Sequence, residues 1–184
     1  MTNITMQWAG ALASVASEAL ASTTRERRIA ERTEREAYQA LRAAQQAARD
    51  DANLKLTRAF AALRKLGFVA RKGFMCCGGC AGAEIANLES AHIDAGGEPH
   101  HGGVFTTQQD RDFISGARPT NSVMLKFGAI DMTGKGVRGG LSTEAVGAAV
   151  VRECERAGLT VRWDGDAARC IEVVFYEKSE GGGR

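Results

Sequence analysis

The stretch LRKLGFVARKG (residues 63–73) combines the end of a helix, a glycine and a short apolar strand within a few residues. Gly67 follows two leucines of an apolar helical stripe, and a glycine in this position typically ends a helix. A second stretch, CERAGLTVRWDG (residues 154–165), repeats the order of helix end, glycine, apolar strand and glycine. A helix–glycine–strand unit that occurs twice favours a layered fold in which helices cover a mixed sheet.

The segments between and after these two units alternate between helical and strand-like patterns. Thr107 and Asp110 have the spacing of a capping box, which predicts the start of a helix, and Ser142 is a further helix cap. We expect helices over 81–91, 108–117 and 143–157, and strands over 68–71, 104–107, 122–130, 159–165 and 170–178. The last two strands are predicted to form a hairpin. The expected fold class is α+β, with a mixed sheet of about five short strands flanked by helices.

Residues 1–66 are predicted to be helical. Residues 7–21 have the apolar spacing of a short amphipathic helix, and Thr23 with Glu26 forms a capping box that predicts the start of a long second helix. The apolar stripe of this helix is mostly alanine in its first half, which buries little area, so we expect a partner helix. That partner is either residues 7–21 folded back or the same helix of another subunit. The bulkier second half is expected to dock onto the domain that follows.

These patterns divide the chain into an N-terminal region (1–66, a long helix or helical hairpin), an α+β domain (67–178) and a tail (179–184) expected to be disordered. Hydrophobic and charged residues make up 44% and 25% of the 184 residues, as in ordinary soluble globular proteins. No segment approaches the roughly 20 apolar residues of a membrane span. Five cysteines without a signal-peptide pattern predict a reducing, cytoplasmic location rather than a secreted disulfide framework.

Charge is distributed unevenly along the chain. Residues 25–65 carry eleven Lys/Arg and six Asp/Glu, whereas residues 66–184 carry thirteen and fifteen. A basic helix attached to a mildly acidic domain raises the hypothesis of nucleic-acid binding. The simpler interpretation is a solvated helix face of mixed charge, which we favour.

The stretch GFMCCGGCAGAEI (residues 73–85) contains three of the five cysteines. Cys77 and Cys80 have the Cys-x-x-Cys spacing at which two thiolates reach one zinc ion, and Cys76 is a third candidate ligand. Further ligands would have to come from elsewhere, with His100 and His101 as candidates and His92 beside them. Two alternatives stay open. Cys80 at a helix N-terminus can be an activated redox thiol, or the glycines form a tight strand-to-helix turn in which the cysteines have a structural role.

Polar residues also follow two of the predicted strands. Gln109 and Asp110 follow the strand at 104–107, and Asp164 lies at the end of the strand at 159–165. Asp110 and Asp164 together can bind a divalent cation or act as acid and base, with Gln109 nearby. The alternative is helix capping by Asp110 and turn formation by Asp164. The glycine-rich segment at 131–140 contains Lys135 and Arg138 but lacks the phosphate-loop order, so it is weak support for anion or partner contact.

Several of these segments occur together in one known family. The chain resembles a bacterial family of unknown function with a Cys-Cys-x-x-Cys turn, a Gln-Gln-Asp segment and a Trp-Asp-Gly segment in this order. The resemblance covers about residues 55–176 and leaves the N-terminal helices outside. It rests on Cys76, Cys77, Cys80, Glu84, Gln108, Gln109, Asp110, Trp163, Asp164 and Gly165. It implies a shared fold, and no reaction is attached to the family.

The sequence favours a small interaction or regulatory protein over an enzyme. We expect the N-terminal helix to mediate self-association or to bind a protein partner, and the Cys/His region to be structural with zinc as its candidate ion. The alternatives are a metal-dependent or enzymatic activity that uses Asp110 and Asp164, and nucleic-acid binding by the basic helix.

Overall fold

The computed structural model describes the backbone of residues 4–115, 120–130 and 140–176, and side chains from residue 23 onward except 112–115. The described helices are α1 (Ile4–Lys65), α2 (Gly78–Asp94), α3 (Gln108–Ser115) and α4 (Thr143–Arg156). The strands are β1 (Val69–Arg71), β2 (Gly103–Phe105), β3 (Ser122–Gly128), β4 (Thr160–Arg162) and β5 (Ile171–Val174). The glycine-rich segment at 131–139 and the tail at 179–184 lie outside the described residues. None of the described helices combines the length and apolarity needed to cross a bilayer.

The five strands form one mixed sheet in the order β1-β2-β3-β5-β4. β1 pairs with β2 in parallel, whereas the pairs β2–β3, β3–β5 and β4–β5 are antiparallel. The α+β class, the mixed five-stranded sheet and the hairpin of its last two strands are therefore confirmed.

Both glycine-ended helices close in the same way. Gly67 and Gly158 have φ angles of +80° and +82°, which a residue with a side chain rarely adopts. The N–H of the following residue then donates five residues back, from Phe68 to Leu63 and from Leu159 to Cys154, at 3.0 Å in each case. This is a Schellman closure, and it turns the chain directly into β1 and β4. The repeated unit in the sequence is thus a repeated backbone structure.

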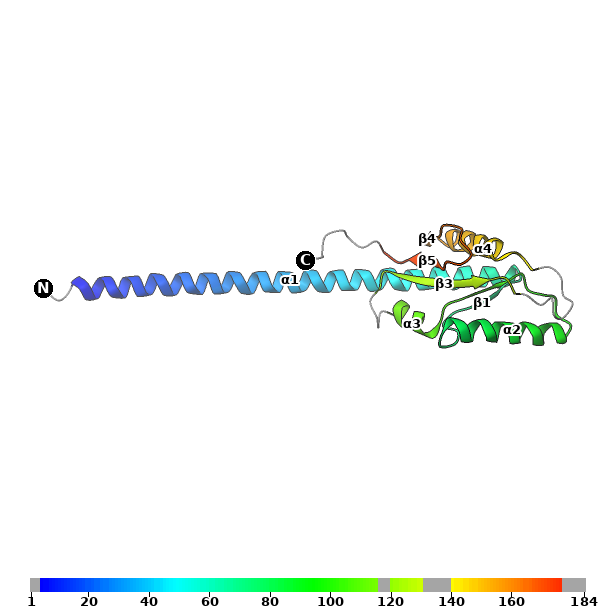
Figure 1. Cartoon of the computed structure of the whole chain (residues 1–184). Helices are drawn as coiled ribbons and strands as arrows, with labels where there is room; N and C mark the ends of the chain where they lie inside the picture. Colours follow the sequence, from blue (N-terminus) through cyan, green and yellow to red (C-terminus); the bar gives the residue numbers. More distant parts are fainter. Residues whose placement is uncertain (1–3, 116–119, 131–139, 177–184) are drawn as a thin grey trace. The chain divides into compact units, whose positions relative to one another are not determined.

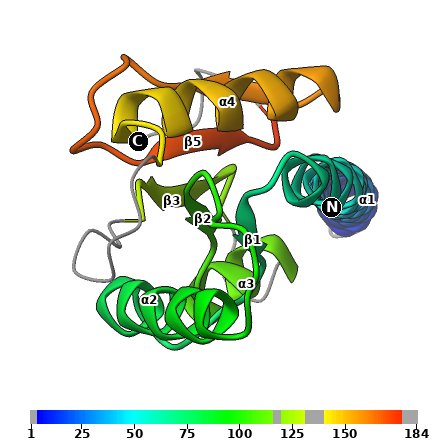
Figure 2. The same cartoon turned by 90° about the vertical axis from the view of Figure 1, so that its right-hand side faces the viewer.

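The main core lies between one face of the sheet and two helices. The second half of α1, from Ala52 to Leu63, packs with α4 against alternate strand residues such as Val104 and Leu125. The docking predicted for this half of the helix is confirmed. The neighbouring strand residue Phe105 points to the opposite face and packs against Ala81 and Ile85 of α2. Figure 2 shows α4 on one side of the sheet and α2 with α3 on the other.

Two predictions about helices need correction. α1 is a single helix that continues through Thr23, so the short helix and the helical hairpin are not formed (Figure 1). The capping box at Thr23 is a local signal, and it lies between alanine-, arginine- and glutamate-rich segments in which helix propagation is favourable. α2 is longer than predicted at both ends, since it begins at Gly78 rather than 81 and ends at Asp94 rather than 91. It begins earlier because the glycines of the cysteine stretch form its first turn.

Candidate functional site

The cysteine stretch is a turn held against the neighbouring strand. The backbone N–H groups of Gly73 and Phe74 donate to the side chain and carbonyl of Thr106, at 2.9 and 2.8 Å. The N–H of Gln108 donates to the carbonyl of Met75 at 2.9 Å. Met75 has a φ of +57°, a left-handed conformation that costs energy for a residue with a side chain. Such strain persists only where the surroundings impose it, and it directs the next residues toward the start of α2.

The turn brings three sulfur atoms together. Cys77 is the N-cap of α2 in an extended conformation, and Cys80 lies in the first helical turn. The Sγ atoms of Cys76, Cys77 and Cys80 all lie within 4.8 Å of one another, and all three residues are exposed. Adjacent cysteine side chains tend to diverge, but here the chain changes direction before α2 and both sulfurs face the same space. Among the described residues this is the one group of three or more potential metal ligands that converge in this way.

Two of the three thiols, Cys77 and Cys80, differ in acidity. Hydrogen bonds from the backbone N–H and side chain of Cys80 lower the pKa of Cys77 below its ordinary value of 9.0. A hydrogen bond with Cys77 and the nearby charges of the other two sulfurs raise the pKa of Cys80 to about 11. The free N–H groups and dipole of a helix N-terminus favour a thiolate at the N-cap. Of Cys77 and Cys80, Cys77 is therefore the thiol that ionises first, whereas the redox alternative considered from the sequence placed the activated thiol at Cys80.

The histidine candidates lie elsewhere. His100 donates to Glu89, which is twelve residues along α2 from Cys77 and hence about 18 Å away along the helix axis. His101 packs the edge of its ring against Phe68, with ring centroids 5.7 Å apart. The structure therefore does not bring His100 or His101 to the cysteines, and no fourth His, Cys, Asp or Glu among the described residues converges with the three sulfurs.

The acidic candidates have structural partners in separate places. Asp110 is buried, and its carboxylate accepts from the N–H and hydroxyl of Thr107 and from the ammonium group of Lys126. The capping box predicted at Thr107 and Asp110 is thus present. Asp164 pairs with Arg169 at 3.0 Å and accepts from the N–H of Asp166 in an exposed turn. Gln109 is exposed on α3.

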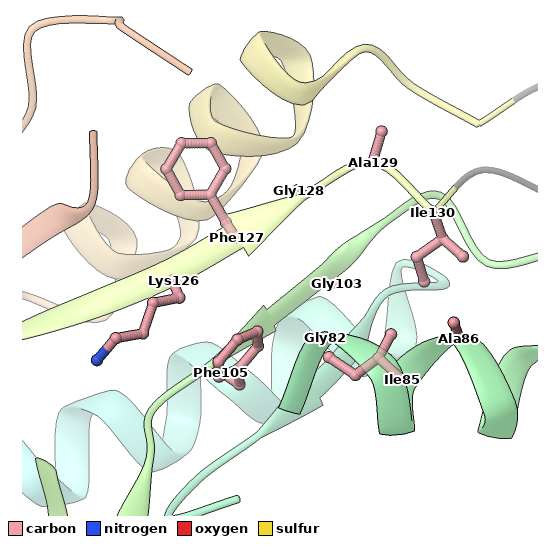
Figure 3. A pocket seen from close by; sticks show the side chains of 10 residues that line it. All are labelled: Gly82, Ile85, Ala86, Gly103, Phe105, Lys126, Phe127, Gly128, Ala129 and Ile130. Atoms are coloured by element: carbon pink, nitrogen blue, oxygen red, sulfur yellow. The ribbon is translucent and has the colours of Figure 1, made fainter. Parts of the chain in front are cut away.

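An apolar cavity of about 320 Å³ lies between the first half of α2 and strands β2 and β3. Figure 3 shows Ile85, Phe105 and Ile130 around it, with no side chain at Gly103 and Gly128. The ammonium group of Lys126, which also lines it, is bonded to Asp110. Sequence reasoning missed this cavity, because it depends on which strand positions face α2.

Comparison with known families finds one family model that matches nearly the whole chain. A family model described as Domain of unknown function (DUF6891) matches residues 5–178. The chain belongs to this family. The match confirms the resemblance to a family of unknown function, and it extends further than expected, since the DUF6891 domain also includes α1 and not residues 55–176 alone. No curated protein and no solved structure matches the chain.

Proposed function

We propose that this DUF6891 domain binds a zinc ion through Cys76, Cys77 and Cys80. The observation that supports this most is the convergence of the three sulfur atoms within 4.8 Å. Zinc–sulfur bonds of about 2.3 Å in a tetrahedron separate the sulfurs by about 3.8 Å, so the ion needs a contraction of about 1 Å or less. Small side-chain rotations supply this, because the three cysteines are exposed.

The difference in acidity between the thiols indicates the order in which the cysteines bind the ion. A metal ligand must be a thiolate, and Cys77 loses its proton more readily than Cys80. The ion then displaces the protons of the remaining thiols. Three protein ligands leave the fourth position to water or to a group from a partner molecule, which agrees with an interaction or regulatory role.

Titration of the reduced full-length protein with zinc, in competition with a chromophoric chelator, tests this proposal. We expect one zinc ion per chain, and weaker binding in the Cys77→Ser variant. Cys170→Ser is the matched control, because Cys170 is an exposed cysteine outside the turn. Cobalt substitution should add thiolate-to-metal absorption bands. The absence of stoichiometric zinc uptake, or equal losses in both variants, contradicts the proposal.

A second proposed activity is self-association through α1. In residues 23–44 the side chains are exposed, and they include Tyr38 and Leu41, which are 61% and 55% exposed. These two residues lie one turn apart on the same side of the helix, beside alanines that allow close approach of a second helix. Burial of an apolar stripe normally supplies most of the stability of a protein helix. We therefore expect a second copy of this segment to pack against the exposed apolar side chains.

A further inference from the structure

A cavity at the far end of α2 from the cysteines has a different chemistry. It has a volume of about 380 Å³, within the range of small-molecule sites. Its lining combines basic, histidine and apolar side chains from α1, β1, α2 and the segment before β2: Arg64, Phe68, Val69, Ala70, Arg71, Leu88, Glu89, His92 and His100.

A buried carboxylate orients one of the two histidines. Glu89 is 1% exposed, and its two oxygens accept from the backbone N–H of His100 at 2.7 Å and from its ring Nδ1 at 2.5 Å. Because an ionised carboxylate only accepts hydrogen bonds, Nδ1 carries a proton in this arrangement. The other ring nitrogen, Nε2, is then the one available to a ligand.

The second histidine, His92, is also oriented by a hydrogen bond from its ring to an acceptor oxygen. The Nε2 atom of His92 lies 2.9 Å from the carbonyl oxygen of Glu98, which can only accept. Nδ1 of His92 is therefore its available nitrogen. The two rings are neighbours, with centroids 4.7 Å apart.

Two arginines give the cavity an excess of positive charge. Arg64 uses one terminal nitrogen to donate to the carbonyl of Ala70 at 3.0 Å, which leaves the other N–H groups of its guanidinium for a ligand. The side chain of Arg71 makes no hydrogen bond or ion pair with any residue that the structure describes. The negative charge of Glu89 is already met by two N–H donors of His100. The lining thus offers the N–H donors of two guanidinium groups, which suit an oxyanion, and two oriented imidazoles whose available nitrogens donate when the rings are protonated.

We propose that this cavity binds a phosphate group, either as free phosphate or as the end of a phosphate monoester. Arg64 and Arg71 hold its oxygens with charge-assisted hydrogen bonds, and His100 donates from Nε2 when protonated. Phe68, Val69 and Leu88 supply an apolar wall for the organic part of a monoester. The inference is independent of zinc binding, since Glu89 lies about 18 Å along α2 from Cys77.

The test uses the full-length protein and two probes, inorganic phosphate and phenyl phosphate, with binding followed by calorimetry and by NMR of the histidine ring carbons. We expect both probes to shift the ring signals of His92 and His100. Tighter binding of phenyl phosphate would identify a monoester site, and equal binding a site for the free anion. Either result supports the proposal.

The decisive comparison is Arg71→Gln with Arg58→Gln. Arg58 is an exposed arginine of α1, six residues before Arg64 and thus about 120° away around the helix. We expect Arg71→Gln to weaken phosphate binding at least about tenfold and Arg58→Gln to leave it unchanged. Circular dichroism checks that both variants fold. Equal affinities of the two variants overturn the proposal, as do ring signals that respond to added zinc and not to phosphate.

Discussion

Lys126 on β3 donates from its ammonium group to the Oδ2 atom of Asp110, 2.7 Å away at the start of α3. The same oxygen accepts from the N–H and the hydroxyl of Thr107, at 2.6 and 2.7 Å. One carboxylate therefore caps a helix and ties that helix to the central strand of the sheet. This relationship gives Asp110 a structural role as a cap of α3 and the ion-pair partner of Lys126.

Asp110→Asn should lower the free energy of unfolding by about 2–3 kcal/mol, because it removes a charged cap and leaves Lys126 without its partner. Asp164→Asn is the control. Asp164 is half exposed and its ion pair with Arg169 is accessible to solvent, so the change should stay within about 0.5 kcal/mol. Urea denaturation followed by circular dichroism measures both. An Asp110→Asn protein as stable as the parent would show that the cap and the ion pair contribute little.

The cysteines should react with iodoacetamide in a defined order. Thiolates are the reactive form, and the pKa of Cys77 is lowered, so its alkylation should begin at a lower pH than that of an ordinary thiol. Cys80, with a pKa of about 11, should lag behind until the pH approaches that value. Peptide mapping by mass spectrometry after short exposures at a series of pH values measures the order.

Cys154 is the internal control for the alkylation experiment. Burial, followed by the charges of Glu153 and Glu155, raises its pKa to about 12, and its side chain is fully buried in the core. It should react only after denaturation. Alkylation of Cys80 before Cys77 in the native protein would contradict the assignment of Cys77 as the more acidic of these two thiols.

Leu41→Glu should weaken self-association, because it places a charge on the exposed apolar side of α1. Gln39→Glu is the matched control, since it introduces the same charge two residues away on a different side of the helix. Sedimentation velocity over a range of protein concentrations compares the two variants with the parent chain. A parent chain that stays monomeric at all concentrations would exclude self-association, and equal effects of both variants would indicate a general charge effect.

Two glycine-to-alanine changes should act in opposite directions. A Cβ atom at Gly147 would lie 2.6 Å from the Trp163 ring and 2.7 Å from the Phe127 ring, so Gly147→Ala should destabilise the protein by about 1–3 kcal/mol. Apart from its chain neighbours and the nearby backbone of α2, no atom of the described residues lies within 4 Å of a Cβ at Gly82. Gly82→Ala should therefore stabilise by about 0.5–1 kcal/mol through helix propensity. Thermal and urea unfolding measure the stability of both variants relative to the parent chain. Stabilisation by both changes would show that the two rings move aside without cost.

The features predicted correctly from the sequence depend on interactions between residues close together in the chain. Gly67 and Gly158 close their helices with hydrogen bonds that span five residues, and the capping box of Thr107 and Asp110 spans three. Such patterns are visible in the sequence because the interacting groups are near neighbours. The helix start predicted at Thr23 was wrong for a related reason. The same local pattern occurs there, but helix formation on both sides continues through it.

The sequence by itself determined the α+β class, the order of the elements and the position of the cysteine turn, because each follows from local backbone preference and apolar periodicity. Only the tertiary structure decided which side chains meet. It separates the histidines from the cysteines along α2, pairs His100 with the buried Glu89, and places Arg64 and Arg71 on the same cavity. It also assigns the lowered pKa to Cys77. The cavity lining depends on contacts between elements distant in sequence, whereas the lowered pKa of Cys77 depends on the conformation of the turn that places Cys80 and Cys76 beside it.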